Sequence, residues 1–238
     1  MTNDEKPLVI FSSDKNPDYY QFSPIVTEFW NHIGFDTFYG LVGSEQFPEI
    51  PNIKSSLQSQ ILRLYATKLF PDRVVLVTDI DMLPLNKDYF ISKLPTNYNQ
   101  FSIYSSDAYL LDKFPIVGNR YPICYLAAYG KTFSSVVLED ENETWENFVN
   151  RLNSLNFGWN TDELYVSEKI NLSGYEKKCY SRGFLDPIKP GLDKPGQIIA
   201  RLDKNYWNVE NIQYVDAHCP RPYTKHRESI DSLRSFII

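Results

Sequence analysis

The sequence predicts an α/β fold: a mostly parallel central sheet with helices on both faces and a smaller antiparallel part toward the C-terminus. The first observation is the apolar run Val74 to Val77, which is short enough for a strand buried on both faces. The second is the order strand, helix, strand, helix, strand from Leu8 to Val77, the opening of a nucleotide-binding half-sheet. The third is a pair of carboxylates, Asp79 and Asp81, directly after that run, where buried parallel strands carry their ligands.

The first half of the chain supplies the elements of this half-sheet. Leu8 to Phe11 predicts the first strand, and Pro24 to Ile33 predicts a helix with apolar residues at helical spacing that stops at Gly34. Phe35 to Val42 alternates as a second strand. Ser55 to Phe70 is an amphipathic helix that ends before a Pro-Asp turn and leads into the acidic strand.

The second half predicts further strands at Phe101 to Ser105, Ile123 to Tyr129 and Ile212 to Val215, and a helix from Trp145 to Leu155. Another helix opens near Trp159, with Thr161 as a candidate N-cap, and the Pro- and Gly-rich stretch Ser181 to Gly196 predicts a long loop. No linker divides the chain. We therefore expect a single domain over 1–238, with a nucleotide-binding half at about 1–105 and a half at about 106–238 that completes the metal and acceptor sites.

Composition excludes several functional classes. The 238 residues carry a net charge of -6, with a pI near 5.2, which argues against nucleic acid or an anionic membrane as the main partner. No apolar run is long enough to span a membrane, and the N-terminus lacks the pattern of a signal peptide, so we expect a soluble cytoplasmic protein. The three cysteines predict neither disulfides nor a metal pair, and no glycine-rich nucleotide motif is present.

The acidic pair after the central strand favours a divalent cation. Two carboxylates one residue apart repel each other unless a cation offsets their charge, and oxygen ligands suit Mg2+ or Mn2+ shared with a phosphate. The alternative is a turn in which Asp79 and Asp81 bond the backbone. Spacing alone leaves the two interpretations about even.

Four features in order resemble a known family. The first strand ends in Ser-Ser-Asp, the second helix carries Gln60 and Arg63, the central strand ends in Thr-Asp-Ile-Asp, and the late strand ends in Asp-Ala-His at His218. This order, from about Leu8 to Arg221, resembles the GT-A glycosyltransferases, in particular their glycogenin-like and galactosyltransferase-like retaining branches. The length and the late Asp-Ala-His also resemble the small glycosyltransferase domains of chlorella viruses.

The resemblance implies a role for each candidate residue. It places the divalent ion on Asp79, Asp81 and His218. It assigns nucleotide and donor binding to Ser12, Ser13, Asp14, Arg63, Asp79, Ile80 and Trp159. It assigns the acids that contact the donor and acceptor sugars, our catalytic candidates, to Asp107, Asp162 and Glu163. Arg221 and Lys225 could neutralise the diphosphate, and Asp216 could orient the imidazole of His218.

Each assignment has a simpler alternative. Ser12 to Asp14 could form a polar turn, Asp107 a turn or N-cap, and Asp216 a loop cap. Arg63 and Lys225 could be solvated. The acids Asp162 and Glu163 could only complement the dipole of a helix N-terminus.

The three histidines divide by context. His218 follows a strand and precedes a proline, where sites concentrate, although a hydrogen-bonded loop histidine is the alternative. His32 lies in an aromatic helix and is expected to be structural. His226 lies in a basic stretch and is expected to be solvated.

These residues predict a metal-dependent hexosyltransferase that moves a sugar from a nucleotide diphosphate to an acceptor hydroxyl on a glycan or glycoconjugate. A UDP-sugar is favoured over a GDP-sugar, and a retaining outcome is favoured. The alternatives are a sugar nucleotidyltransferase and a non-catalytic nucleotide- or glycan-binding domain of the same fold.

Overall fold

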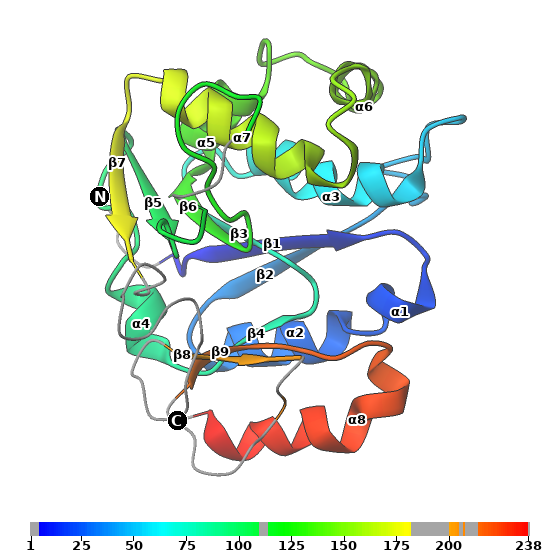
Figure 1. Cartoon of the computed structure of the whole chain (residues 1–238), viewed down its shortest axis with the longest axis vertical. Coiled ribbons are helices and arrows are strands. Elements are labelled where there is room, and N and C mark those ends of the chain that lie inside the picture. The colour runs from blue at the N-terminus through cyan, green and yellow to red at the C-terminus, as the bar shows by residue number, and fades with distance from the viewer. Residues whose placement is uncertain (1–4, 110–113, 182–199, 205–206, 208–213, 238) are drawn as a thin grey trace.

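The computed structural model describes residues 5–109, 114–181, 200–204, 207 and 214–237 (Figure 1). Within these residues the main sheet has six strands in the order β2-β1-β3-β6-β5-β7. In that order the strands are Asp36–Leu41, Leu8–Ser13, Val74–Thr78, Tyr125–Tyr129, Gln100–Tyr104 and Glu176–Tyr180.

The predicted α/β class and mostly parallel sheet are confirmed. β1 lies parallel to both β2 and β3, and β5 lies parallel to β7. Only β6 runs against its neighbours, since it pairs antiparallel with β3 and with β5. The carboxyl ends of β1 and β3 therefore meet at one edge of the sheet, which is where the sequence places its acidic residues.

A second, smaller sheet lies in the C-terminal part of the fold. It has the order β4-β9-β8, formed by Met82–Pro84, Tyr214–His218 and Ala200–Asp203. β4 and β9 are antiparallel, whereas β8 is parallel to β9, so only one of its two pairs is antiparallel as expected.

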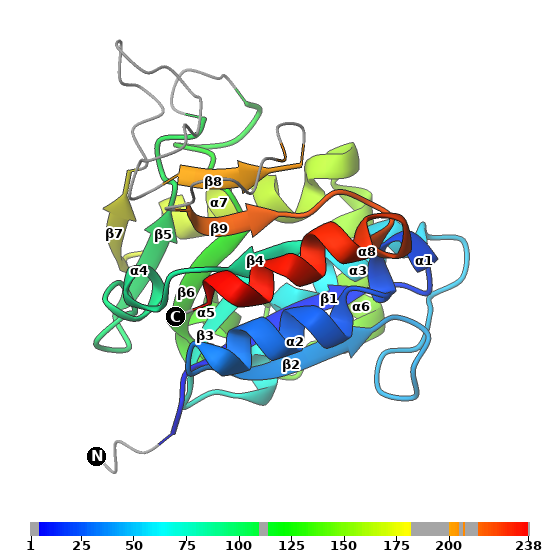
Figure 2. The same cartoon turned by 90° about the horizontal axis from the view of Figure 1, so that it is seen from below.

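Helices cover both faces of the main sheet, and the small sheet lies on one of these faces (Figure 1). One face carries α3 (Ser55–Tyr65), α5 (Gly130–Val137), α6 (Trp145–Ser154) and α7 (Thr161–Leu172). The other carries α2 (Ser23–His32), the small sheet and α8 (Tyr223–Asp231), which lies beside β9 and α2 in Figure 2. The short elements are α1 (Pro17–Tyr20), α4 (Lys87–Ile91) and the 3-10 helices η1 (Ala66–Leu69), η2 (Gly158–Asn160) and η3 (Ser232–Phe236).

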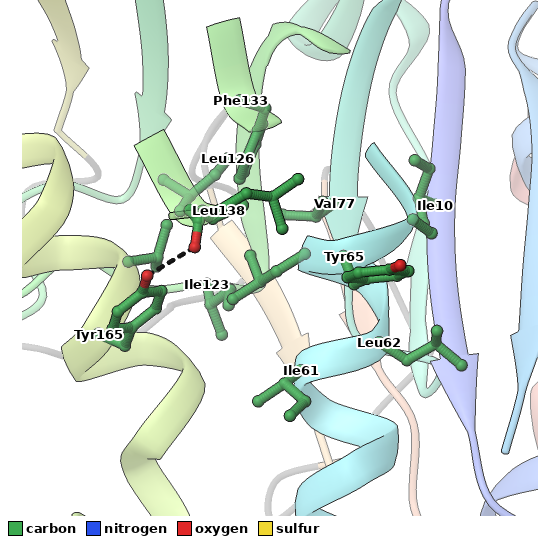
Figure 3. Packing of buried hydrophobic residues seen from close by; sticks show 14 of the residues in the cluster. Ile10, Ile61, Leu62, Tyr65, Val77, Ile123, Leu126, Phe133, Leu138 and Tyr165 are labelled. Atoms are coloured by element: carbon green, nitrogen blue, oxygen red, sulfur yellow. Dashed lines mark hydrogen bonds between the residues drawn. The ribbon is translucent and has the colours of Figure 1, made fainter. Parts of the chain in front are cut away.

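Alternation along β1 explains the two apolar layers. Leu8 and Ile10 belong to the layer under α3, whereas Val9 and Phe11 belong to the layer over α2. Figure 3 shows Leu62 and Tyr65 of α3 packed toward Ile10 and Val77 of the sheet. β1 and β3 are buried on both faces, as their apolar runs predict.

Most element boundaries agree with the prediction to within a few residues. The helix predicted to run to Phe70 leaves the α conformation at Tyr65 and continues as η1. Gly34 has φ +98, a conformation that suits glycine, and it ends α2 as expected. Thr161 is not an N-cap, because the cap position of α7 is Asn160 and the Thr161 hydroxyl donates to the Gly158 carbonyl at 2.8 Å.

Two predicted segments are only partly covered. Residues 182–196 of the predicted loop and residues 212–213 of the predicted late strand fall outside the described residues. Among the residues that are described, every helix is too short or too polar to pass through a lipid bilayer.

Candidate functional site

A cavity of about 340 Å³ opens at the carboxyl ends of β1 and β3. Side chains from α3, η2, α7 and β9, together with Lys204 directly after β8, complete its walls. Most of the predicted site residues line it, namely Ser12, Ser13, Asp14, Arg63, Asp79, Ile80, Asp81, Trp159, Asp162, Glu163, His218 and Arg221. The fold therefore brings together residues from both ends of the chain.

The end of β1 forms one wall. The Ser12 hydroxyl donates to the Ser59 carbonyl at 2.6 Å, and the Ser13 hydroxyl lies 2.6 Å from the Tyr39 hydroxyl. Asp14 accepts a hydrogen bond from the Ser55 hydroxyl at 2.8 Å. These bonds tie the strand end to α3 and β2, so the polar edge is built into the fold and is more than a solvated turn.

A polar stripe on α3 forms the next wall. Ser56, Gln60 and Arg63 are three or four residues apart, Ser59 lies next to Gln60, and all four line the cavity. Ser56 and Ser59 were not predicted as site residues, although their helical spacing was a usable signal.

Arg63 is the central cation of this wall. It is only 5% exposed, which excludes a solvated helix face. One guanidinium nitrogen donates to Asp79, and another donates to Asp162 Oδ2 at 2.6 Å. Burial would raise the pKa of Asp79, but Arg63 outweighs it and holds that pKa below its ordinary value. At Asp162 burial outweighs Arg63, and the pKa is raised.

Asp81 and His218 face each other across two paired strands. Met82 of β4 pairs with His218 of β9, and the Cys219 N–H donates to the Asp81 carbonyl at 2.8 Å. Asp81 is 5% exposed, and its Oδ2 lies 3.4 Å from His218 Nε2. The β4–β9 ladder thus brings together two side chains that are far apart in the sequence.

These two side chains fit a divalent ion as two of its ligands. A separation of 3.4 Å between Asp81 Oδ2 and His218 Nε2 is close to the spacing of two adjacent ligands of one ion with bonds of ~2.1 Å. Asp79 is already engaged by Arg63. In the described part of the chain, no three His, Cys, Asp or Glu side chains form a cluster able to chelate an ion by themselves. An ion on Asp81 and His218 would have its remaining coordination positions open to water or phosphate oxygens.

Asp203, and not Asp216, orients the imidazole. The Asp203 carboxylate lies 3.4 Å from His218 Nδ1 at the end of β8. Burial lowers the pKa of His218, but bonds to Asp203 and Asp81 outweigh it and raise that pKa to about 9. Asp216 is fully buried and pairs instead with Arg201, whose Nη2 donates to it at 2.8 Å. The suggested contact between Asp216 and the imidazole was therefore wrong.

Two cationic side chains lie beside Asp81 and His218. Lys204 Nζ lies 3.2 Å from His218 Nε2, and Arg221 Nε lies 3.4 Å from Asp81 Oδ2. Both line the cavity, whereas Lys225 is exposed on α8 and is not among the lining residues. Lys204 was missed, because β8 is a short strand with no motif in its sequence.

Glu163 and Arg120 close the opposite wall. The Arg120 guanidinium donates to Glu163 and to Asn160 and lies over the Tyr109 and Phe114 rings, 4.2 and 4.4 Å from their centroids. The Ile123 N–H donates to the other Glu163 oxygen at 3.1 Å. Burial still raises the pKa of Glu163 to about 7.

Two predicted residues differ from the rest. Asp107 is buried just after β5, is bonded by the Ser181 hydroxyl and is not among the cavity-lining residues. Trp159 lines the cavity but is 64% exposed, so its indole lies at an open edge, and its carbonyl accepts from Gln60 at 3.1 Å.

The other histidines lie elsewhere. His32 is exposed at the end of α2, so the expectation of a structural role was wrong. His226 is half-buried on α8 and does not line the cavity.

No protein-family model matches the sequence, and no curated protein matches it. Among solved structures, the galactosyltransferase LgtC, in complex with donor and acceptor sugar analogs, is 11% identical with a TM-score of 0.50 over 97% of this chain and 95% of its own. The chain has the GT-A fold.

Other solved structures are similar at a lower score. A glycosyltransferase involved in the glycosylation of the major capsid of PBCV-1 is 11% identical, with a TM-score of 0.49 over 96% of this chain and 100% of its own. The glycosyltransferase GlyE of Streptococcus pneumoniae TIGR4 is 11% identical, with a TM-score of 0.48 over 99% of this chain and 61% of its own. At these identities the likeness concerns the GT-A fold alone, and the chemistry must be argued from the cavity.

Proposed function

We propose that this protein is a metal-dependent glycosyltransferase that uses a nucleotide-diphosphate sugar, with a UDP-sugar favoured. The observation that carries the proposal is the meeting of Asp81, His218, Lys204 and Arg221 at one point of the cavity. A carboxylate, an imidazole and two cations form a site that suits an ion and a diphosphate together.

Each wall of the cavity would bind a different part of the substrate complex. Asp81 and His218 would hold Mn2+ or Mg2+, which would act as a Lewis acid on the leaving diphosphate. Arg221 and Lys204 would donate to phosphate oxygens. Ser12, Ser13 and Asp14 at the end of β1 would face the nucleoside, beside the stripe of α3. Positioning of these groups before the substrate arrives lowers the cost of reaching the transition state.

The carboxylates of α7 suit the sugar. Arg63 holds Asp162, and Arg120 with the Ile123 N–H holds Glu163, so both acids are fixed at the cavity wall. Fixed carboxylates can accept hydrogen bonds from sugar hydroxyls and stabilise positive charge as the glycosidic bond breaks. A retaining outcome remains favoured by resemblance. Asp107 has no role in this proposal.

Trp159 suits the acceptor better than the donor. A donor sugar between diphosphate and carboxylates would be enclosed, whereas the indole is 64% exposed. An aromatic face at an open edge can pack on a sugar ring. We therefore assign Trp159 to a glycan or glycoconjugate acceptor.

The test is Asp81→Asn, which keeps the shape of the side chain but removes the charge that would hold the ion. We expect Mn2+-dependent binding of UDP and sugar transfer from a UDP-sugar to be lost, with an unchanged circular dichroism spectrum. Asp88→Asn, on the exposed surface of α4, is the matched control and should behave as wild type. Full Mn2+-dependent UDP binding by the Asp81→Asn variant would refute the proposal.

A further inference from the structure

Both atoms that would hold the ion are already in contact with a side-chain cation. Lys204 Nζ lies 3.2 Å from His218 Nε2, and Arg221 Nε lies 3.4 Å from Asp81 Oδ2. The two cations come from different positions, the end of β8 and the segment after β9. Lys204 and Arg221 thus offset part of the negative charge of the cavity.

Lys204 and an ion on His218 cannot occupy these positions together. An ion bonded to Nε2 would lie ~2.1 Å from that nitrogen, in the space that the ammonium faces. A dication and an ammonium that close repel each other strongly. One of them must therefore leave Nε2 when the other is bound.

Lys204 has a place to go. A second cavity adjoins the first and is lined by Asp18, Tyr19, Lys204, Pro220 and Arg221. Arg221 is packed over the Tyr19 ring, 4.7 Å from its centroid, so it is the more fixed of the two cations. Lysine carries its charge on a flexible four-carbon stem and can turn without movement of the backbone.

We propose that Lys204 takes the place of the metal ion in the nucleotide-free protein and is exchanged for the ion when a nucleoside diphosphate binds. The inference rests on the proposed function, because it assigns the ion and the diphosphate to this cavity. The ion displaces the ammonium from Nε2 and binds the neutral imidazole, whose proton is released to water, and the diphosphate supplies the new anionic partner for Lys204.

The exchange makes the two ligands depend on each other. Mn2+ alone must displace Lys204 from His218 with no diphosphate to receive the ammonium, so its affinity is weak. With the diphosphate present, Lys204 gains a partner as it leaves, and the ion binds more tightly. By linkage, the ion raises the affinity for the diphosphate by the same factor.

The experiment measures Mn2+ binding by electron paramagnetic resonance of the free aqueous ion, with and without UDP. Lys204→Met keeps the length of the side chain and removes its charge. We expect Mn2+ alone to bind this variant at least ~10-fold more tightly than wild type, and UDP to increase that affinity by a smaller factor. Lys225→Met changes the net charge equally, lies outside the cavity and should match wild type.

The outcomes separate this inference from the proposed function. Equal Mn2+ affinity of wild type and Lys204→Met, with UDP tightening both equally, would overturn the exchange and leave the function standing. Absence of Mn2+ binding in wild type and both variants, with and without UDP, would overturn both. A gain in Mn2+ affinity shared by Lys225→Met would reduce the effect to net charge and also overturn the exchange.

Discussion

Glu163 has an environment that makes stability depend on pH. The Arg120 guanidinium and the Ile123 N–H both bond its carboxylate, yet burial raises its pKa to about 7. In the unfolded chain a glutamate titrates near ~4.3, so the folded protein binds this proton more tightly. The resulting stabilisation is complete below the unfolded pKa and is lost as the pH rises toward about 7.

We therefore predict that Glu163→Gln reduces the pH dependence of unfolding. The free energy of unfolding of wild type, relative to the variant, should fall by about 1–3 kcal/mol between ~pH 4 and ~pH 8. Urea denaturation at several pH values measures this difference. A difference that stays constant across the range would show that folding does not raise the pKa of Glu163.

His218 and His32 provide a matched pair of substitutions. His218→Ala removes a proposed ion ligand at the edge of the small sheet, so Mn2+-dependent UDP affinity should fall roughly 100-fold, while stability changes by about 1 kcal/mol or less. His32→Ala should leave both quantities near wild type, because the side chain is exposed. Calorimetry and thermal denaturation distinguish the two. A loss of metal dependence in the His32 variant would contradict the assignment.

Individual site residues differed in how far the sequence could predict them. Asp79, Asp81 and His218 lie at ends of apolar strands, so their positions at a sheet edge could be predicted. Asp203, Lys204 and Arg120 lie in short or irregular segments, and only the folded chain shows that Lys204 and Arg120 line the cavity and that Asp203 contacts His218. The pairing of Arg63 with two acids also needed the structure, because it joins three separate elements.

The junction between β6 and α5 tolerates only glycine. A Cβ on Gly130 would lie 2.1 Å from the Phe70 carbonyl oxygen and 2.7 Å from that of Thr67, and both are backbone atoms. Gly130→Ala would force η1 away from α5, and we expect a cost of about 2–4 kcal/mol.

Gly174→Ala is the control, since a Cβ there meets nothing within 4 Å. It should change stability by less than about 0.5 kcal/mol. Urea denaturation of both variants checks the contrast. Equal stabilities would mean that η1 can shift at little cost.

Most elements with a clear apolar period were predicted, and most of the missed ones lack it, although α5 was missed and buries Phe133, Val136 and Val137. β1, β3, α2 and α3 are buried along one or both faces, so their spacing is readable. β7 is a polar edge strand, β4 has only three residues, and α8 buries Ile230 alone. Their positions depend on neighbours that the local sequence does not contain.

For the whole molecule, the proposed function predicts a stabilisation that needs both ligands. UDP with Mn2+ at about 100 times the dissociation constant should stabilise the fold by roughly 2.7 kcal/mol. That corresponds to a rise in melting temperature of roughly 5–10 °C for a chain of this size. UDP or Mn2+ alone should give a smaller shift, and an unchanged melting temperature with UDP, GDP and their sugars would contradict the proposal.

The antiparallel pair β4–β9 can form only after a late part of the chain has been synthesised. Met82 faces His218 and Leu83 faces Ala217, so the early strand is completed by a late one. While the chain grows on the ribosome, the strands from β1 to β6 emerge well before β9. During that interval Asp81 has no imidazole beside it, and Leu83 has no partner strand. A nascent chain therefore lacks the proposed ion site, and synthesis of one late strand both pairs with β4 and completes that site.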